Sequence, residues 1–430
     1  LGIHGDPQRI GAPLYLWPIG LWLRLVGLGL WQGRLTMWLF MPLAVAFTYR
    51  AARTLFRDSG VGLLAALLTA TSALTLYSAH FIRPEIALSA VLALALALHA
   101  RAEKRQRCRE AFALGLLLSL AMTVHTNAFI FCFAFGTYYL GRWLWACWRA
   151  RRFTLEGRLL GLAAGGLVGA AIFAAVYILP DGAAFRQQMN YYYLLNYDET
   201  QATLPEVLLD RALTALNHLR TWFAFSLVEG SAVALAGIAA LVAGRRAERS
   251  LLALLALSIV GLFLVGGRRA PTYITPLVPL GAMLVAGMLA RLLAGSGRAL
   301  VIGALLAAAV SGVSVRQVIV AEREGYNREF ERCLAVVKAW LPEDGMILGE
   351  HLFWLGRPAL TGYASRTLVE VPWPTRSAGE WWAWIDPDIV LWPGPPSGAA
   401  SQYLQAHGYT SYDFPACPTS ELTIWLRPGV

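Results

Sequence analysis

Two adjacent arginines, Arg268 and Arg269, stand directly before the proline-rich run from Pro271 to Pro279. The planar guanidinium group binds phosphate through two parallel hydrogen bonds. Long apolar stretches flank the pair on both sides, so it marks a helix start beside a lipid phase. A lipid-linked phosphate or diphosphate would explain the pair, with Tyr273 beside it. The alternative is two solvated arginines that extend toward lipid headgroups, and we favour the phosphate interpretation.

A second candidate site is the turn His80-Phe81-Ile82-Arg83-Pro84-Glu85. Glu85 could serve as a base or as a ligand of a metal, with His80 as a further ligand. Arg83 could contact an anionic group such as a phosphate. The alternative is a simple helix start with Pro84 at the first position and Glu85 in the first turn. The arginine beside them favours the site.

Two further polar segments are candidates for binding an acceptor or a sugar. His125 and Asn127 form a polar notch between two apolar stretches, either a site wall or a hairpin turn. Tyr193 and Asp198 lie in an aromatic and acidic stretch suited to stacking on a sugar and binding its hydroxyls. Tyrosines also anchor loops at membrane interfaces, which is the better explanation for this stretch.

Composition shows which elements must position these residues. Of the 430 residues, 57% are hydrophobic and only 14% are charged, whereas soluble domains carry about 25% charged residues. The mean hydropathy is +0.53. The net charge of +10 does not indicate nucleic-acid binding, because the arginines lie between apolar segments and form no aromatic-interleaved patch. The composition predicts an α-helical polytopic membrane protein.

The apolar segments predict about ten transmembrane helices, each long enough to cross the hydrocarbon core. They are residues 33–54, 60–80, 85–100, 111–126, 127–147, 159–180, 219–243, 250–266, 271–291 and 299–318. Alternate connections are rich in arginine, which predicts that they are cytoplasmic and that both ends of the chain are extracytoplasmic. Residues 111–147 could form one long helix or a hairpin, and because they are too long for one crossing, we predict a hairpin broken at residues 124–127.

Three regions follow from this pattern. Residues 1–32 are predicted to be an extracytoplasmic segment with an interfacial helix over 13–27, residues 33–318 the transmembrane domain, and residues 319–430 an extracytoplasmic α/β domain. In the last, helices are predicted near 326–340 and 399–407, and strands near 345–349, 387–392, 409–413 and 422–426. A packed core explains its tryptophans Trp373, Trp381, Trp382 and Trp384.

These features resemble a known family. The stretch PLYLWPIGLWLRLVG, an arginine-ended span and then Arg83-Pro84-Glu85 look like the GT-C fold glycosyltransferases that use polyprenyl-phosphate-linked sugars. These include the protein mannosyltransferase-like and the lipid A aminoarabinose transferase-like enzymes. The run RRAPTYITPLVPL is similar to their late R-x-x-x-Y-x-x-P-x-x-P helix start.

The resemblance implies transfer of a sugar from a lipid phosphate to a glycan, lipid or protein acceptor at the outer face of the bacterial inner (plasma) membrane. A divalent metal is a possible cofactor, and Glu85 matches a second acidic position that holds metal or acceptor. The family's catalytic Asp-Glu lies some tens of residues before the PLY stretch. Here Asp6 is the sole carboxylate before Pro13 and is a weak candidate. We therefore expect the base, with at least one more span, upstream of Leu1.

Two other functions remain open. A non-catalytic scaffold subunit on the same fold would explain the absent Asp-Glu pair. A lipid or polysaccharide transporter would have inverted repeats and charges at mid-membrane, whereas the charges here are predicted at the ends of spans.

Overall fold

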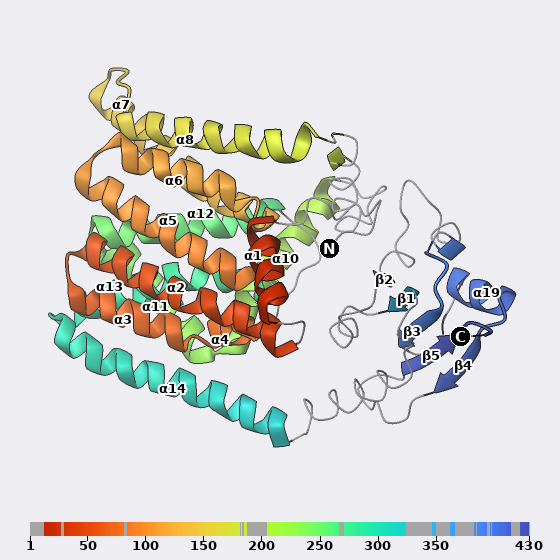
Figure 1. Cartoon of the computed structure of the whole chain (residues 1–430). Helices are drawn as coiled ribbons and strands as arrows, with labels where there is room; N and C mark the ends of the chain where they lie inside the picture. Colours follow the sequence, from red (N-terminus) through yellow and green to blue (C-terminus); the bar gives the residue numbers. More distant parts are fainter. Residues whose placement is uncertain are drawn as a thin grey trace.

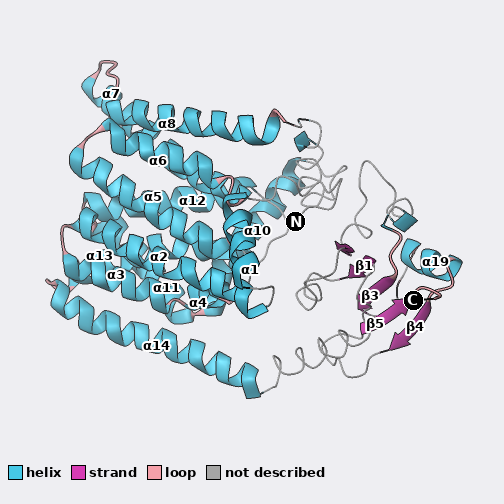
Figure 2. Ribbon diagram, viewed as in Figure 1, coloured by secondary structure: helices cyan, strands magenta, loops and turns pink. Residues whose placement is uncertain are grey.

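A bundle of long helices makes up most of the computed structural model, and a small sheet follows it in the chain (Figures 1 and 2). The structure describes residues 13–26, 30–80, 84–180, 182, 185–186, 204–265, 271–323, 346–349, 362–365, 382–383, 385–393, 396, 398–413 and 422–429. The helical elements are α1 (Pro13–Val26), α2 (Leu30–Phe56), α3 (Ser59–Thr71), α4 (Ala73–Ala79), α5 (Glu85–Arg105), α6 (Cys108–Ala121), η2 (Thr126–Ala128), α7 (Phe129–Ala150), α8 (Gly157–Phe173), η3 (Ala174–Ile178), α10 (Leu204–Phe225), α11 (Leu227–Ala243), α12 (Arg246–Val265), η4 (Pro271–Leu277), α13 (Val278–Leu292) and α14 (Ser296–Arg323).

The number of predicted crossings is not confirmed. Among the described helices, five are long and apolar enough to span a membrane, and six if the bent pair of α3 and α4 counts as one. Two helices within the predicted spans are shorter than the roughly 20 residues that a crossing needs: α6 has 14 residues and α11 has 17. The predicted hairpin is confirmed, since α6 and α7 are separated by a turn and the short helix η2.

Two helical segments are broken at a serine. The axes of α3 and α4 differ by 53° across Ser72, and Ser226 separates α10 from α11. Each serine caps the next helix, because its hydroxyl accepts a backbone N–H from the first turn. Residues 204–218 lie between the predicted apolar segments 159–180 and 219–243, and the prediction of a loop there is wrong, because they belong to α10. Charged residues interrupt its apolar run, so the run length alone did not reveal the helix.

The core of the bundle lies around α5 and α13. In the most apolar stretch of each, 78% and 83% of the residues are buried. Both helices are rich in alanine and other small residues, which lets neighbouring helices approach closely. Helix α5 contacts α2, α6 and η4, and α13 contacts α3, α11 and α14.

Helices α6 and α8 pack with their backbones in close contact. Gly161, Gly165 and Gly169 recur every fourth residue on α8, and a methyl group at Gly165 would overlap the carbonyl of Phe112 on α6. Small residues at this spacing are typical of helix pairs in membranes. The Ser119 hydroxyl adds a 3.0 Å hydrogen bond to the carbonyl of Gly166.

Helix α1 occupies the range predicted for an interfacial helix. It lies against α2, where the Trp22 indole N–H donates to the carbonyl of Gln32 at 3.1 Å. Ile19 is buried in the same contact, whereas Leu21 and Leu25 are exposed. Its place at the membrane interface stays a prediction.

The five-stranded sheet has the order β2-β1-β3-β5-β4. The parallel strands are β1 (Met346–Gly349), β2 (Gly362–Ser365) and β3 (Ile389–Pro393), whereas β4 (Thr410–Asp413) and β5 (Leu422–Leu426) are antiparallel. Helix α19 (Ala399–Ala406) and four of these strands lie within two residues of their predicted ranges, and β2 was not predicted. Trp382 is fully buried and stacks on Tyr403 with ring centroids 5.0 Å apart, which confirms its predicted core role.

Candidate functional site at the η4 end of the bundle

The short helix η4 is the centre of the candidate site. It contacts α4, α5 and α10 as well as α13, which it precedes. Ile274 and Thr275 are fully buried. The hydroxyls of Thr275 and Ser78 form a buried hydrogen bond of 2.7 Å, which ties η4 to α4. The start of α5, the end of α4 and the second half of α10 therefore meet at η4.

Tyr273 on η4 lies against two histidines from different parts of the chain. Its ring centroid is 5.8 Å from that of His125 in the turn before α7 and 6.2 Å from that of His218 on α10. The Nδ1 atom of His125 accepts the backbone N–H of Asn127 at 3.0 Å. An accepting Nδ1 belongs to a neutral ring whose proton is on Nε2. The structure thus brings together two predicted site residues, His125 and Tyr273, and holds Asn127 beside them.

Glu85 begins α5 as predicted, with Pro84 at the preceding cap position. It is 2% exposed. The next two residues of the helix belong to a cluster of buried apolar side chains contributed by α1, α2, α4, α5 and the turn before α7, namely Ile19, Met37, Ala79, Ile86, Ala87 and Val124. A carboxylate in the first turn of a helix interacts favourably with the helix dipole, and burial among apolar groups strengthens its electrostatic interactions. Both the predicted helix start and a functional role are compatible with this position.

His80 lies in a different environment. It is exposed, its Nδ1–H donates to the carbonyl of Leu76 at 2.6 Å, and its ring packs edge-on against Trp38 at 5.2 Å. In the described part of the chain, no group of three or more His, Cys, Asp or Glu side chains could hold a metal ion. The described residues do not fit a metal centre around Glu85 and His80. The metal stays a prediction.

Six predicted site residues lie outside the described residues. They are Asp6, Arg83, Tyr193, Asp198, Arg268 and Arg269. Arg268 and Arg269 come just before η4 in the chain, and Arg83 comes two residues before Glu85.

Sequence reasoning missed His218 and Glu229. His218 is 1% exposed and sits one helical turn before the buried Trp222 on α10. Glu229 follows Ser226 by three residues, the spacing of a capping box, and opens an otherwise apolar helix. That spacing was a detectable signal, and so was a carboxylate inside a long apolar run.

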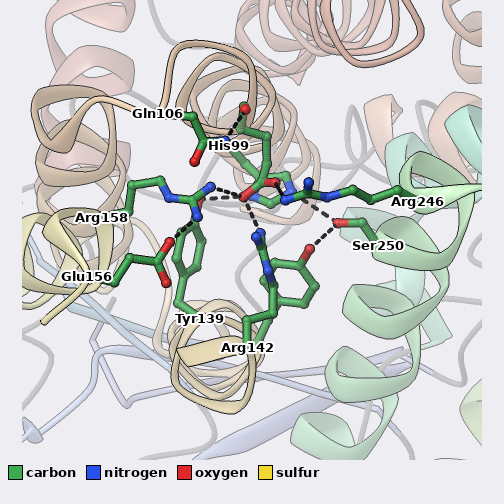
Figure 3. Close-up of polar contacts among 10 residues, drawn as sticks. His99, Gln106, Tyr139, Arg142, Glu156, Arg158, Arg246 and Ser250 are labelled. Carbon is green, nitrogen blue, oxygen red and sulfur yellow. Dashed lines mark hydrogen bonds and ion pairs between the residues drawn. The ribbon is translucent and has the colours of Figure 1, made fainter. Parts of the chain in front are cut away.

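The opposite end of α5 carries an ion cluster instead (Figure 3). The Glu103 carboxylate accepts hydrogen bonds from Arg142 on α7, Arg158 on α8 at 2.8 Å and Arg246 on α12 at 3.1 Å. Arg158 also pairs with Glu156. Four helices are therefore tied to one carboxylate. From the sequence these arginines could be interpreted only as indicators of the cytoplasmic side of the membrane, because their common partner Glu103 is distant in the chain.

An aromatic network continues this cluster into the bundle. The fully buried His99, one turn before Glu103, contacts the Tyr139 hydroxyl at 3.1 Å and the Ser250 hydroxyl at 3.3 Å. The Ser250 hydroxyl donates to the Tyr138 hydroxyl at 2.7 Å. Every described charge of this cluster is engaged, which favours a structural role for this end.

Comparisons with known proteins agree with this fold. Residues 10–178 match the family model for dolichyl-phosphate-mannose-protein mannosyltransferase, a match that includes Glu85 and His125 and ends before η4. No curated protein matches the chain in a sequence comparison.

Two solved structures of ArnT from Cupriavidus metallidurans share the fold, one bound to undecaprenyl phosphate and one in the apo state. Their TM-scores are 0.60 and 0.59 at 16% sequence identity, over 96% of this chain and 87% of theirs. The match over residues 10–178 and the fold shared with ArnT together confirm the predicted resemblance to the GT-C fold glycosyltransferases.

Proposed function

We propose that this protein is a membrane glycosyltransferase that moves a sugar from a polyprenyl-phosphate donor to an acceptor at the η4 end of its helical bundle. One observation carries the proposal: η4 places Tyr273 against His125 and His218, next to the helix that begins with the buried Glu85. The fold shared with an ArnT structure that holds undecaprenyl phosphate supports a lipid phosphate as the donor.

The proposed reaction breaks one bond, forms another and moves one proton. The bond between the anomeric carbon and the phosphate oxygen breaks, and the phosphate leaves on its lipid with the electron pair. Arg268, Arg269, Arg83 and Tyr273 are proposed to stabilise that phosphate. The anomeric carbon bonds to an acceptor oxygen or nitrogen, whose proton passes to a carboxylate. Glu85 is proposed to hold the acceptor or take its proton, and His125, Asn127, Tyr193 and Asp198 to line the acceptor or sugar site.

The orientation and division of the chain belong to the same proposal. The η4 end would face the outside of the plasma membrane and the Glu103 end the cytoplasm, because arginines gather at the latter. Residues 33–318 would form the transmembrane domain and residues 319–430 an extracytoplasmic α/β domain that covers the site or binds the acceptor.

The test uses the purified full chain in liposomes. Native mass spectrometry measures binding of undecaprenyl phosphate, and a second assay follows the loss of a radiolabelled sugar from undecaprenyl-phosphate-linked donors. We expect Arg268→Ala to weaken binding of the lipid and Glu85→Gln to reduce transfer, each about tenfold or more, because each removes a charged group from the site. Arg249→Ala, an exposed arginine at the opposite end, is the matched control.

Three outcomes are informative. Equal binding by the wild type and Arg268→Ala would contradict the phosphate assignment. Unchanged transfer in Glu85→Gln would remove Glu85 from the site. Lipid binding without transfer from any donor tested would favour the non-catalytic scaffold.

A further inference from the structure

Glu229 connects the two broken helical segments of the bundle. Its Oε1 atom accepts the Ser72 hydroxyl at 2.8 Å and the Trp222 indole N–H at 3.0 Å. Its Oε2 atom accepts the backbone N–H of Ala73 at 3.2 Å. Ser72 and Ala73 lie at the break between α3 and α4, and Trp222 lies just before the break between α10 and α11. One carboxylate therefore holds two distant breaks together.

The position of Glu229 is itself fixed by its own helix. Its backbone N–H donates to the hydroxyl of Ser226, the cap residue of α11, at 3.2 Å. The Ser72 hydroxyl, which donates to Glu229, also accepts the backbone N–H of Thr75 on α4 at 3.4 Å. Such chains of hydrogen bonds are costly to break in a medium of low polarity. The arrangement fixes both helices relative to each other.

Both helices held by Glu229 continue to η4. Six residues after Ser72, Ser78 of α4 reaches the Thr275 hydroxyl of η4. One turn before Trp222, His218 of α10 contacts Tyr273 of η4. The two helices also meet directly, since Tyr77 and Phe225 pack edge to face with centroids 4.7 Å apart. Glu229 thus holds α4 and α10, the two helices that contact η4 in the candidate site.

We propose that Glu229 is a positioning residue for the η4 site, acting through α4 and α10. The inference rests on the proposed function for its effect on sugar transfer, whereas its effect on the two helices does not. A carboxylate suits the place because all three groups facing it are donors, one of them a backbone N–H. An amide can accept with its oxygen only, and its NH₂ group would face a donor.

The first experiment measures the geometry without any transfer assay. Tyr77→Cys and Phe225→Cys are introduced into the full chain after its native cysteines are replaced by serine, and a short bifunctional thiol reagent is added in liposomes. We expect efficient cross-linking with Glu229 in place and a rate about tenfold lower with Glu229→Gln. Glu229→Asp, which keeps the charge, should recover part of the rate. Thr221→Ala is the control, because that hydroxyl bonds only within α10, to the carbonyl of Asn217.

The second experiment measures sugar transfer per folded molecule. For Glu229→Gln we expect kcat to fall about tenfold, with KM for the lipid donor changed less than about threefold. A residue needed only for folding would lower the yield of folded protein and leave kcat unchanged. Unchanged cross-linking in Glu229→Gln would overturn the proposal. Slower cross-linking in a protein whose wild type transfers no sugar would leave the positioning role standing and contradict the proposed function instead.

Discussion

The two ends of helix α5 carry glutamates with opposite surroundings. Glu85 and Glu103 are 18 residues apart, about 27 Å along a helix that rises 1.5 Å per residue. Glu103 meets arginines from three other helices, whereas Glu85 is buried and the next two residues of the helix belong to an apolar cluster. The ion cluster satisfies its charges internally and fixes helices, which is what a structural element requires.

The η4 end has polar groups of a different kind. Tyr273, His125 and His218 each carry a ring with hydrogen-bonding atoms, and the Tyr273 ring packs against both histidines. We therefore expect variants at the Glu103 end of the bundle to lower its stability, and variants at the η4 end to lower its activity.

The largest expected effect is that of Glu103→Ala. Removing the shared carboxylate leaves three arginines close together, with Glu156 still paired to Arg158, so the variant should lose about 3–5 kcal/mol of stability. Thermal unfolding in detergent, followed by size-exclusion fluorescence, measures the loss. Arg246→Ala is the graded control and should cost less than about 1 kcal/mol, because that side chain is 72% exposed. Equal effects of the two variants would contradict the cluster as a structural unit.

Gly165→Leu should have the next largest effect. The side chain would enter the close contact between α8 and the backbone of α6, and overpacking of this kind costs about 1–3 kcal/mol. The measurement is the same unfolding assay. Gly136→Ala on α7 serves as the control, because a methyl group there meets nothing within 4 Å. A stable Gly165→Leu variant would mean that the ion cluster alone holds this part of the bundle.

The smallest effect concerns the sheet. Arg427 donates to Asp386 at 3.0 Å and holds the pKa of that carboxyl below its usual range. Because the folded pKa is lowered, the stabilisation is present above the unfolded value of about 3.9 and is lost as the pH falls through the folded value. At pH 7 the wild-type protein should therefore unfold at a higher temperature than the Asp386→Asn variant. The difference should shrink as the pH falls below the unfolded value. A difference independent of pH would exclude this ion pair as its source.

Much of the helical framework could be predicted, because long apolar runs in the sequence indicate membrane helices without any knowledge of distant contacts. The hairpin turn near His125, the helix start at Glu85 and the helix at Pro13–Val26 all follow from apolar runs and polar interruptions. The same rule did not reveal the first part of α10, where charged residues interrupt the apolar run. Its ten crossings are not confirmed, because α6 and α11 are shorter than a crossing needs. Four of the five strands followed from alternation and turn residues, whereas the four-residue β2 did not.

The candidate site was predictable only in part. Glu85, His125 and Tyr273 drew attention as polar residues at the ends of apolar segments, and that signal needs no partner. His218 and Glu229 gain their meaning from Tyr273 and from Ser72, which are far away in the chain. A single sequence contains no direct record of such distant pairs.

The sequence by itself determined that this is a helical membrane protein with a glycosyltransferase-like pattern, because burial in lipid demands long apolar helices whatever their neighbours are. Only the tertiary structure decided which polar residues meet. It gathered arginines of α7, α8 and α12 on Glu103 and placed Glu229 between two broken helical segments. The physical reason is that hydrogen bonds and ion pairs act over a few ångströms in space, whatever the separation of their partners in the sequence. Ser72 and Glu229, for example, are more than 100 residues apart in the chain.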